Sequence, residues 1–132
     1  MAIEYVFQLC TTTPVQAFAH LEGKSSTGLL TTVRPDGRAN LVLVEPELSV
    51  GFRFDKIAEP EPQYAELVRT VVRLLADEPG DAMLQQDFER ILLLRRGTDV
   101  QLGDIWLWSN PEWLALIPSP YTRRPMPYPE DC

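Results

Sequence analysis

Residues 62–76 have the sequence PQYAELVRTVVRLLA, and this stretch decides the fold class. Its apolar residues recur at intervals of three or four positions, which is the spacing of the buried face of a helix. That face consists of Tyr64, Leu67, Val68, Val71, Leu74 and Leu75. The residues that point away from it are Glu66, Arg69 and Arg73. We therefore predict one long amphipathic helix over about 62–76, and it must end before Pro79 and Gly80 because proline disfavours helical geometry in the preceding residue.

Short strands are predicted on both sides of this helix. Residues 48–55 (LSVGFRFD) alternate strictly between apolar and other side chains, which is the period of a strand with one buried face. Residues 3–10 show the same period. Weaker strand patterns cover 27–33, 39–44, 82–86, 90–95 and 99–102, and the turn sequence at 34–37 makes the first two of these a hairpin. Strands in consecutive groups around one helix favour an antiparallel sheet over a parallel α/β arrangement.

Two shorter helices are predicted near the ends of the chain. Residues 13–16 (TPVQ) match a capping box, so a helix should start at Thr13 and run to about Leu21. Asn110 followed by Pro111 favours another start, with a helix to about Leu116. From position 118 onward the chain is expected to be extended. The whole chain, residues 1–132, is thus expected to be a single α+β domain in which an antiparallel sheet packs with one long and two short helices.

The charge balance limits the classes of partner. Nineteen acidic residues against twelve basic ones give a formal net charge of -7. Such a protein repels nucleic-acid phosphates and anionic membrane surfaces, so we expect neither as a partner. The N-terminus shows no basic leader before an apolar stretch, and we expect a cytoplasmic protein. Cys10 and Cys132 fit no metal or redox spacing, so free thiols are expected.

No residue pattern indicates catalytic chemistry. His20 is the single histidine, which rules out a two-histidine metal site and leaves it as an ordinary polar residue near a helix end. Residues 23–25 (GKS) resemble the end of a phosphate-binding loop, but the earlier glycine of such a loop would have to stand at Phe18. We therefore expect no cofactor and no enzymatic activity. The alternative is a small hydrolase or ligand-binding domain that uses a carboxylate pair and a metal.

Three tryptophans near the C-terminus suit either a core or an interface. Trp106 and Trp108 would share one side of an extended segment, and Trp113 would open the last helix. Aromatic side chains of this kind often centre an interface, and as often they fill a core. The sequence therefore allows two states, a monomer and a homodimer whose interface contains these tryptophans.

Four stretches of the chain carry a family resemblance. They are 47–56 (ELSVGFRFDK), 74–82 (LLADEPGDA), 92–96 (LLLRR) and 113–121 (WLALIPSPY). Together they resemble a family of small immunity proteins from bacterial polymorphic toxin systems, the Sit (swarming inhibition) group. The resemblance implies a protein that protects its producer, or its kin, by binding and neutralising a cognate toxin. It implies no catalytic residues.

The acidic composition suggests how such a partner would be attracted. If the cognate toxin is basic, for example a nuclease with a basic cleft, an acidic inhibitor could occupy that cleft in place of phosphates. The candidate contact residues are the acidic side chains at the connections around the later strands: Asp77, Glu78, Asp81, Asp87 and Glu89.

Overall fold

The protein is built on one mixed sheet that carries its helices on one face. The computed structural model describes residues 4–35, 47–87, 90–117 and 120–126. Within these residues eight strands follow the order β2-β3-β4-β1-β5-β6-β7-β8. The strands are β1 Glu4–Leu9, β2 Gly23–Lys24, β3 Leu30–Pro35, β4 Leu48–Arg53, β5 Ala82–Gln86, β6 Arg90–Arg96, β7 Asp99–Gly103 and β8 Thr122–Arg124.

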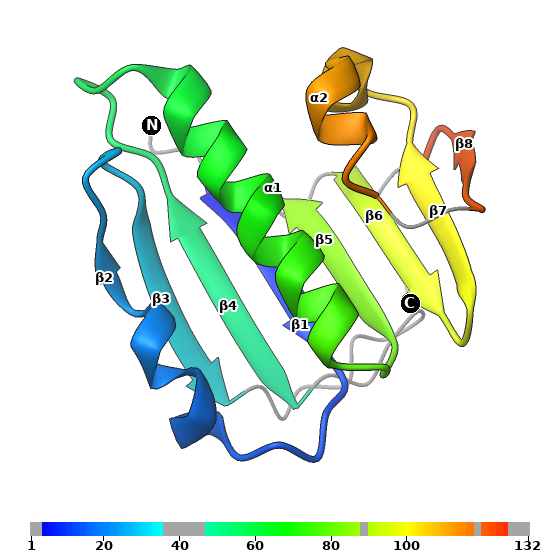
Figure 1. Cartoon of the computed structure of the whole chain (residues 1–132), viewed down its shortest axis with the longest axis horizontal. Coiled ribbons are helices and arrows are strands. Elements are labelled where there is room, and N and C mark those ends of the chain that lie inside the picture. Colours follow the sequence, from blue (N-terminus) through cyan, green and yellow to red (C-terminus); the bar gives the residue numbers. More distant parts are fainter. Residues whose placement is uncertain (1–3, 36–46, 88–89, 118–119, 127–132) are drawn as a thin grey trace.

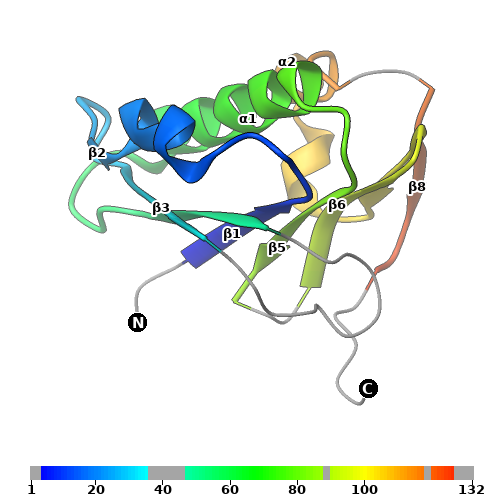
Figure 2. The ribbon, with the colours of Figure 1, turned by 90° about the horizontal axis from the view of Figure 1, so that it is seen from below.

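The long helix α1 (Pro60–Asp77) lies over the middle of the sheet and runs nearly along the direction of its central strands (Figure 1). Figure 2 shows two shorter helical segments over the same face, the 3-10 helix η1 (Val15–Leu21) and α2 (Pro111–Leu114). A further 3-10 helix, η2 (Trp106–Ser109), leads from β7 into α2. The predicted α+β class, with one long and two short helices packed on a sheet, is confirmed. None of the helices in the described residues is both long and apolar enough to span a membrane.

The core lies between α1 and the central strands, where the sequence pattern places it. The buried residues of the strands include Tyr5, Phe7, Leu9, Leu48, Val50, Phe52 and Leu84, and those of α1 are Leu67, Val68, Val71, Leu74 and Leu75, with Gln63 beside them. Tyr64 is half-buried and packs against the same cluster. Each buried Leu or Val contributes about 1.5 to 3 kcal/mol before conformational entropy is subtracted. The predicted helix stripe and the alternation of 48–55 are therefore both confirmed.

The sequence led us to expect a wholly antiparallel sheet, but the sheet is mixed. The pairs from β2 to β7 are antiparallel, but β7 and β8 run parallel. Between them the chain passes through η2 and α2 over the helical face, and this crossover lets β8 run in the same direction as β7.

Two helix predictions near the ends need correction. The first short helix is a 3-10 helix without a capping box, because the Thr13 hydroxyl donates to the Glu78 carboxylate (3.0 Å) and leaves the helix start uncapped. The segment around Trp106 and Trp108 is helical, not extended. At about three residues per turn the two rings point to different sides, so Trp108 is buried and Trp106 is 54% exposed. The predicted cap at Asn110 is confirmed, since its side chain accepts from the Glu112 N–H (2.9 Å).

Several strand boundaries differ in detail from the prediction. The strand expected at 27–33 starts at Leu30, because the chain first makes a turn closed by a hydrogen bond from the Gly28 N–H to the Ser25 carbonyl (3.0 Å). Several predicted features lie outside the described residues: the partner strand at 39–44, positions 36–37 of the turn, Glu89 and Cys132. Within the described residues β3 pairs with β4.

The C-terminal end of α1 is held by a buried guanidinium. Arg95 of β6 is 9% exposed and donates to the main-chain carbonyls of Leu75 (2.7 Å), Glu78 and Gly80 (2.6 Å). Carbonyls at a helix C-terminus lack intrahelical donors and carry partial negative charge, so a cation there satisfies both needs. Burial lowers the pKa of Arg95, while Asp81 opposes this shift. The turn also needs Gly80, because a Cβ there would stand 1.9 Å from the Cys10 carbonyl oxygen.

We predict that Val71→Asp abolishes folding. Val71 is 1% exposed, and an unpaired carboxylate at that depth should cost more than about 4 kcal/mol. Ala76→Asp is the matched control, since Ala76 is on the exposed side of the same helix. Circular dichroism with thermal unfolding measures both. A cooperative transition for Val71→Asp near that of the wild type would contradict the packing described above.

We also predict that Arg95→Met lowers the free energy of unfolding by about 3 kcal/mol, because the carbonyls at the end of α1 lose a charged donor. Arg96→Met is the control, because Arg96 is the exposed neighbour and should change stability by less than about 0.5 kcal/mol. Urea titration compares the two. An equal loss of unfolding free energy in both variants would contradict the role assigned to Arg95.

Candidate binding groove

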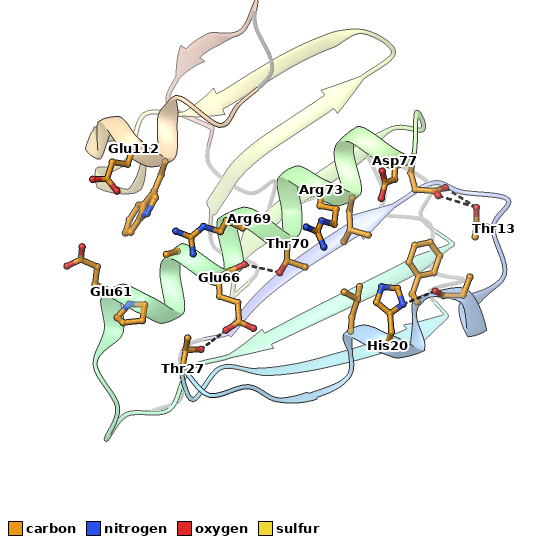
Figure 3. A pocket seen from close by; sticks show the side chains of 18 of the residues that line it. Thr13, His20, Thr27, Glu61, Glu66, Arg69, Thr70, Arg73, Asp77 and Glu112 are labelled. Carbon is orange, nitrogen blue, oxygen red and sulfur yellow. Dashed lines mark hydrogen bonds between the residues drawn. The ribbon is translucent and has the colours of Figure 1, made fainter.

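A groove of about 840 Å³ runs along the outer side of α1 (Figure 3). Its apolar lining includes Phe18 and Leu21 from η1, Leu74 from α1 and Trp113 from α2. The groove exists because α1 and η1 each pack on the sheet and leave a channel between them. Of the apolar lining, Phe18, Leu74 and Trp113 are buried, so they form a firm floor under a more polar rim.

Charged residues are distributed along the groove in a pattern. Six carboxylates and two guanidiniums line it: Glu59, Glu61, Glu66, Asp77, Glu78, Glu112, Arg69 and Arg73. Figure 3 shows Glu61 and Glu112 at the end near the start of α1, and Asp77 at the other end. Arg69 and Arg73 lie between the two ends. At 1.5 Å per residue, Glu61 and Asp77 are separated by about 24 Å along the helix axis.

Two of the carboxylates hold the groove walls together. Glu66 accepts hydrogen bonds from the hydroxyls of Ser25 (2.5 Å) and Thr27 (2.6 Å), which ties the 25–28 turn to α1. Glu78 accepts from the hydroxyls of Thr11 and Thr13, which ties the chain before η1 to the end of α1. These two side chains therefore have structural roles at the sides of the groove.

The other charged groups of the groove are not engaged in this way. Within the described residues, no side-chain hydrogen bond or ion pair is formed by Glu59, Glu61, Asp77, Glu112, Arg69 or Arg73. Their charges face solvent at the rim and remain available to a partner. His20 also lines the groove, and its Nδ1 lies 3.1 Å from the Ala17 carbonyl oxygen, which fits the ordinary polar role expected of it.

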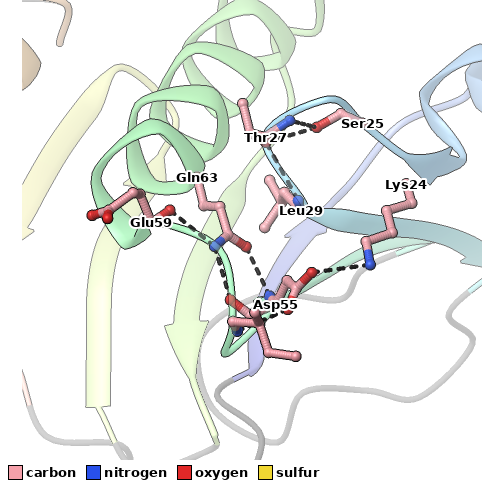
Figure 4. A network of polar contacts seen from close by, with 8 residues as sticks. Lys24, Ser25, Thr27, Leu29, Asp55, Glu59 and Gln63 are labelled. Atoms are coloured by element: carbon pink, nitrogen blue, oxygen red, sulfur yellow. Dashed lines mark hydrogen bonds and ion pairs between the residues drawn. The ribbon is translucent and has the colours of Figure 1, made fainter.

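A polar network fixes the start of α1 and the acidic end of the groove (Figure 4). Gln63 is fully buried, accepts from the Asp55 N–H (2.8 Å), and donates to the carbonyls of Asp55 (3.0 Å) and Glu59 (3.1 Å). The Asp55 carboxylate accepts from the Ile57 N–H (2.9 Å) and pairs with Lys24 (3.0 Å). The Ile57 bond, followed by the Lys24 contact, lowers the pKa of Asp55 below its ordinary value of 3.8.

The five acidic residues predicted as partner contacts do not form one cluster. Asp77 and Glu78 lie together at the end of the groove. Asp81 accepts from the Gly97 N–H (2.8 Å), and Asp87, which has a φ of 49°, accepts from the Glu4 N–H (3.2 Å). Asp81 and Asp87 flank the two ends of β5, so about 20 Å of extended chain separates them. Glu89 lies outside the described residues.

Sequence reasoning missed two features of this site. Glu112 shares an end of the groove with Glu61 only because α2 packs beside α1, and nothing in the sequence signals that proximity. Gln63 did leave a signal, since it falls on the apolar face of the long helix one turn before Leu67. A buried amide at such a position requires partners from another segment.

Comparisons with known proteins give one match. A family model described as SitI3-like matches residues 24–113, which include α1 and the strands from β3 to β7. No curated protein and no solved structure matches significantly. In the part of the chain that the structure describes, no group of three or more His, Cys, Asp or Glu side chains could hold a metal ion.

The Asp55 network predicts a specific dependence on pH. Because the folded state lowers the pKa of this carboxyl, its stabilising effect is present above the ordinary value of 3.8 and is lost as pH falls through the lowered value. Asp55→Asn should therefore melt below the wild type at neutral pH, and the gap in Tm should narrow as pH falls below about 4. Asp99→Asn, which makes the same change at an exposed carboxylate that accepts from the Gln101 side chain, is the control. A gap for Asp55→Asn that is the same at pH 7 and pH 3 would count against this account.

Proposed function

The chain belongs to the SitI3-like family, and on this basis we propose that it is an immunity protein that binds and neutralises a cognate bacterial toxin. The family match carries the proposal, because it spans the long helix α1 and five of the strands, β3, β4, β5, β6 and β7. Neutralisation proceeds by occupancy: the protein covers a surface that the toxin needs, and it uses no cofactor and no turnover. The encounter takes place in the cytoplasm of the protected cell.

Surface chemistry supports a protein as the partner. Trp106 is 54% exposed, and its ring packs edge-on against Tyr64 of α1 (4.9 Å between centroids). Ile57, just before α1, is 97% exposed. Ile57 thus precedes the first turn of α1, and Trp106 of η2 contacts that part of the helix through Tyr64. Large apolar side chains next to unpaired charges provide the apolar contact and the polar rim of a protein interface.

The net charge of -7 favours a basic toxin. Opposite charge speeds the encounter between two proteins and opposes association with other acidic proteins. Among the acidic residues predicted as contacts, Asp77 has a position consistent with this role, because it lines the groove and makes no side-chain hydrogen bond or ion pair within the described residues. Glu78 also lines the groove, but its carboxylate is bonded to Thr11 and Thr13. The acids at the two ends of β5 are used within the fold.

The test is co-expression with the protein encoded by the adjacent reading frame. We expect that protein to arrest bacterial growth when expressed alone and this chain to restore growth. Size-exclusion chromatography with light scattering should show a stable complex with one copy of each chain, or two of each if the immunity protein is a dimer. An unrelated acidic protein of similar size serves as the control for charge alone.

The same experiment separates binding from catalysis. Protection at far less than one immunity chain per toxin, together with a chemically altered toxin, would contradict the proposal and favour an enzyme. Absence of both protection and complex formation would refute it.

A further inference from the structure

We propose that the groove beside α1 receives a segment of the toxin that has basic side chains at both ends and an acidic side chain between them. This inference rests on the proposed function, and it assigns the partner's chemistry to one surface. Three observations carry it: the size and apolar floor of the groove, the order of charges along it, and the absence of internal partners for those charges.

The size of the groove fits one segment of a partner. About 840 Å³ is the range of pockets that enclose a few side chains or one small ligand. A stable protein complex buries roughly 800 Å² on each partner, so further contacts must come from the surrounding rim. The buried floor at Phe18, Leu74 and Trp113 gives the apolar part of such a segment a surface to pack against.

The order of charges along the groove predicts the charge that the toxin segment must carry at each position. Glu61 and Glu112 stand at one end, and Asp77 stands at the other, about 24 Å from Glu61 along the helix (Figure 3). A docking partner displaces water from these carboxylates, and they then require cationic donors. Lys or Arg side chains spaced to reach both ends would meet that requirement.

The middle of the groove selects against a uniformly basic segment. Arg69 and Arg73 point into it between the acidic ends, and neither makes an ion pair in the described part of the chain. Glu66 also lies between the ends, but its carboxylate already accepts from the hydroxyls of Ser25 (2.5 Å) and Thr27 (2.6 Å). A third cation placed there would meet repulsion, whereas an Asp or Glu would be paired. The groove therefore distinguishes one order of charges, positive then negative then positive, from simple basicity.

The experiment uses the full chain and the toxin identified by co-expression. The variants are Glu61→Arg and Asp77→Arg, one at each end of the groove, and Arg73→Glu in the middle. Asp99→Arg is the matched control, since it makes the same change of charge at the exposed first residue of β7, outside the groove. Thermal unfolding of each variant first shows that it folds, and calorimetry then gives Kd.

We expect each groove variant to weaken binding by about tenfold or more, while Asp99→Arg changes Kd by less than about threefold. Wild-type affinity should fall as salt rises from about 0.05 to 0.5 M, and the two acid reversals should reduce that dependence. Reversing the matching basic residue of the toxin should restore binding to the corresponding variant and to no other.

The outcomes separate this inference from the proposed function. Two results would refute the assignment of the groove as the binding site and leave the immunity role intact. One is wild-type protection with an unchanged Kd in all three groove variants. The other is an equal loss of affinity in the Asp99→Arg control. The same holds if the groove variants alter only the self-association of the free chain, because a second copy then fills the groove. Failure of the wild type itself to bind or protect overturns the proposed function, and the groove assignment with it.

Discussion

The packing of α1 on the central strands is the constraint from which the other features follow. Leu67, Val71 and Leu74 must face the sheet, and this fixes the rotation of the helix about its own axis. At 3.6 residues per turn, that rotation leaves Arg69, Arg73 and their neighbours on the outer side. The charge pattern of the groove is thus a consequence of core packing. A helix rotated by about half a turn would bury the arginines and expose the leucines.

Two polar networks fix where α1 starts and ends along the sheet. Gln63 holds the end of β4 against the first turn, and Arg95 of β6 holds the last carbonyls. Apolar packing tolerates a small slide of a helix, but hydrogen bonds of defined direction do not. Buried polar groups of this kind give position more than stability, because the gain from each bond is offset by its desolvation. The positions of Glu61 and Asp77 relative to the sheet are therefore fixed.

The fold was predictable to the extent that it depends on periodicity. Residues 48–55 and 62–76 have clear periods of two and of three to four, because one face of each meets the core. Strand β8 was not predictable, since Thr122–Arg124 is exposed throughout and joins β7 through strand pairing and one side-chain hydrogen bond, from Arg124 to Gln101 (2.7 Å). The capping box predicted at Thr13 does not form, because the Thr13 hydroxyl donates to the Glu78 carboxylate, which is distant in sequence. Likewise, the groove brings together helices that are far apart in sequence, and no local pattern encodes that.

Net charge determines how strongly a surface attracts oppositely charged proteins, whereas the order of charges determines which of them fits. The value of -7 sets how strongly basic proteins are attracted, and it does so without regard to which basic protein arrives. Arg69 and Arg73 work against that general attraction, because they place positive charge in the middle of an otherwise acidic groove. A surface selected only for affinity toward cations would gain by replacing them. Their presence is understandable if the protein must bind one partner and reject similar ones, because repulsion at a defined place separates related ligands more sharply than added attraction does.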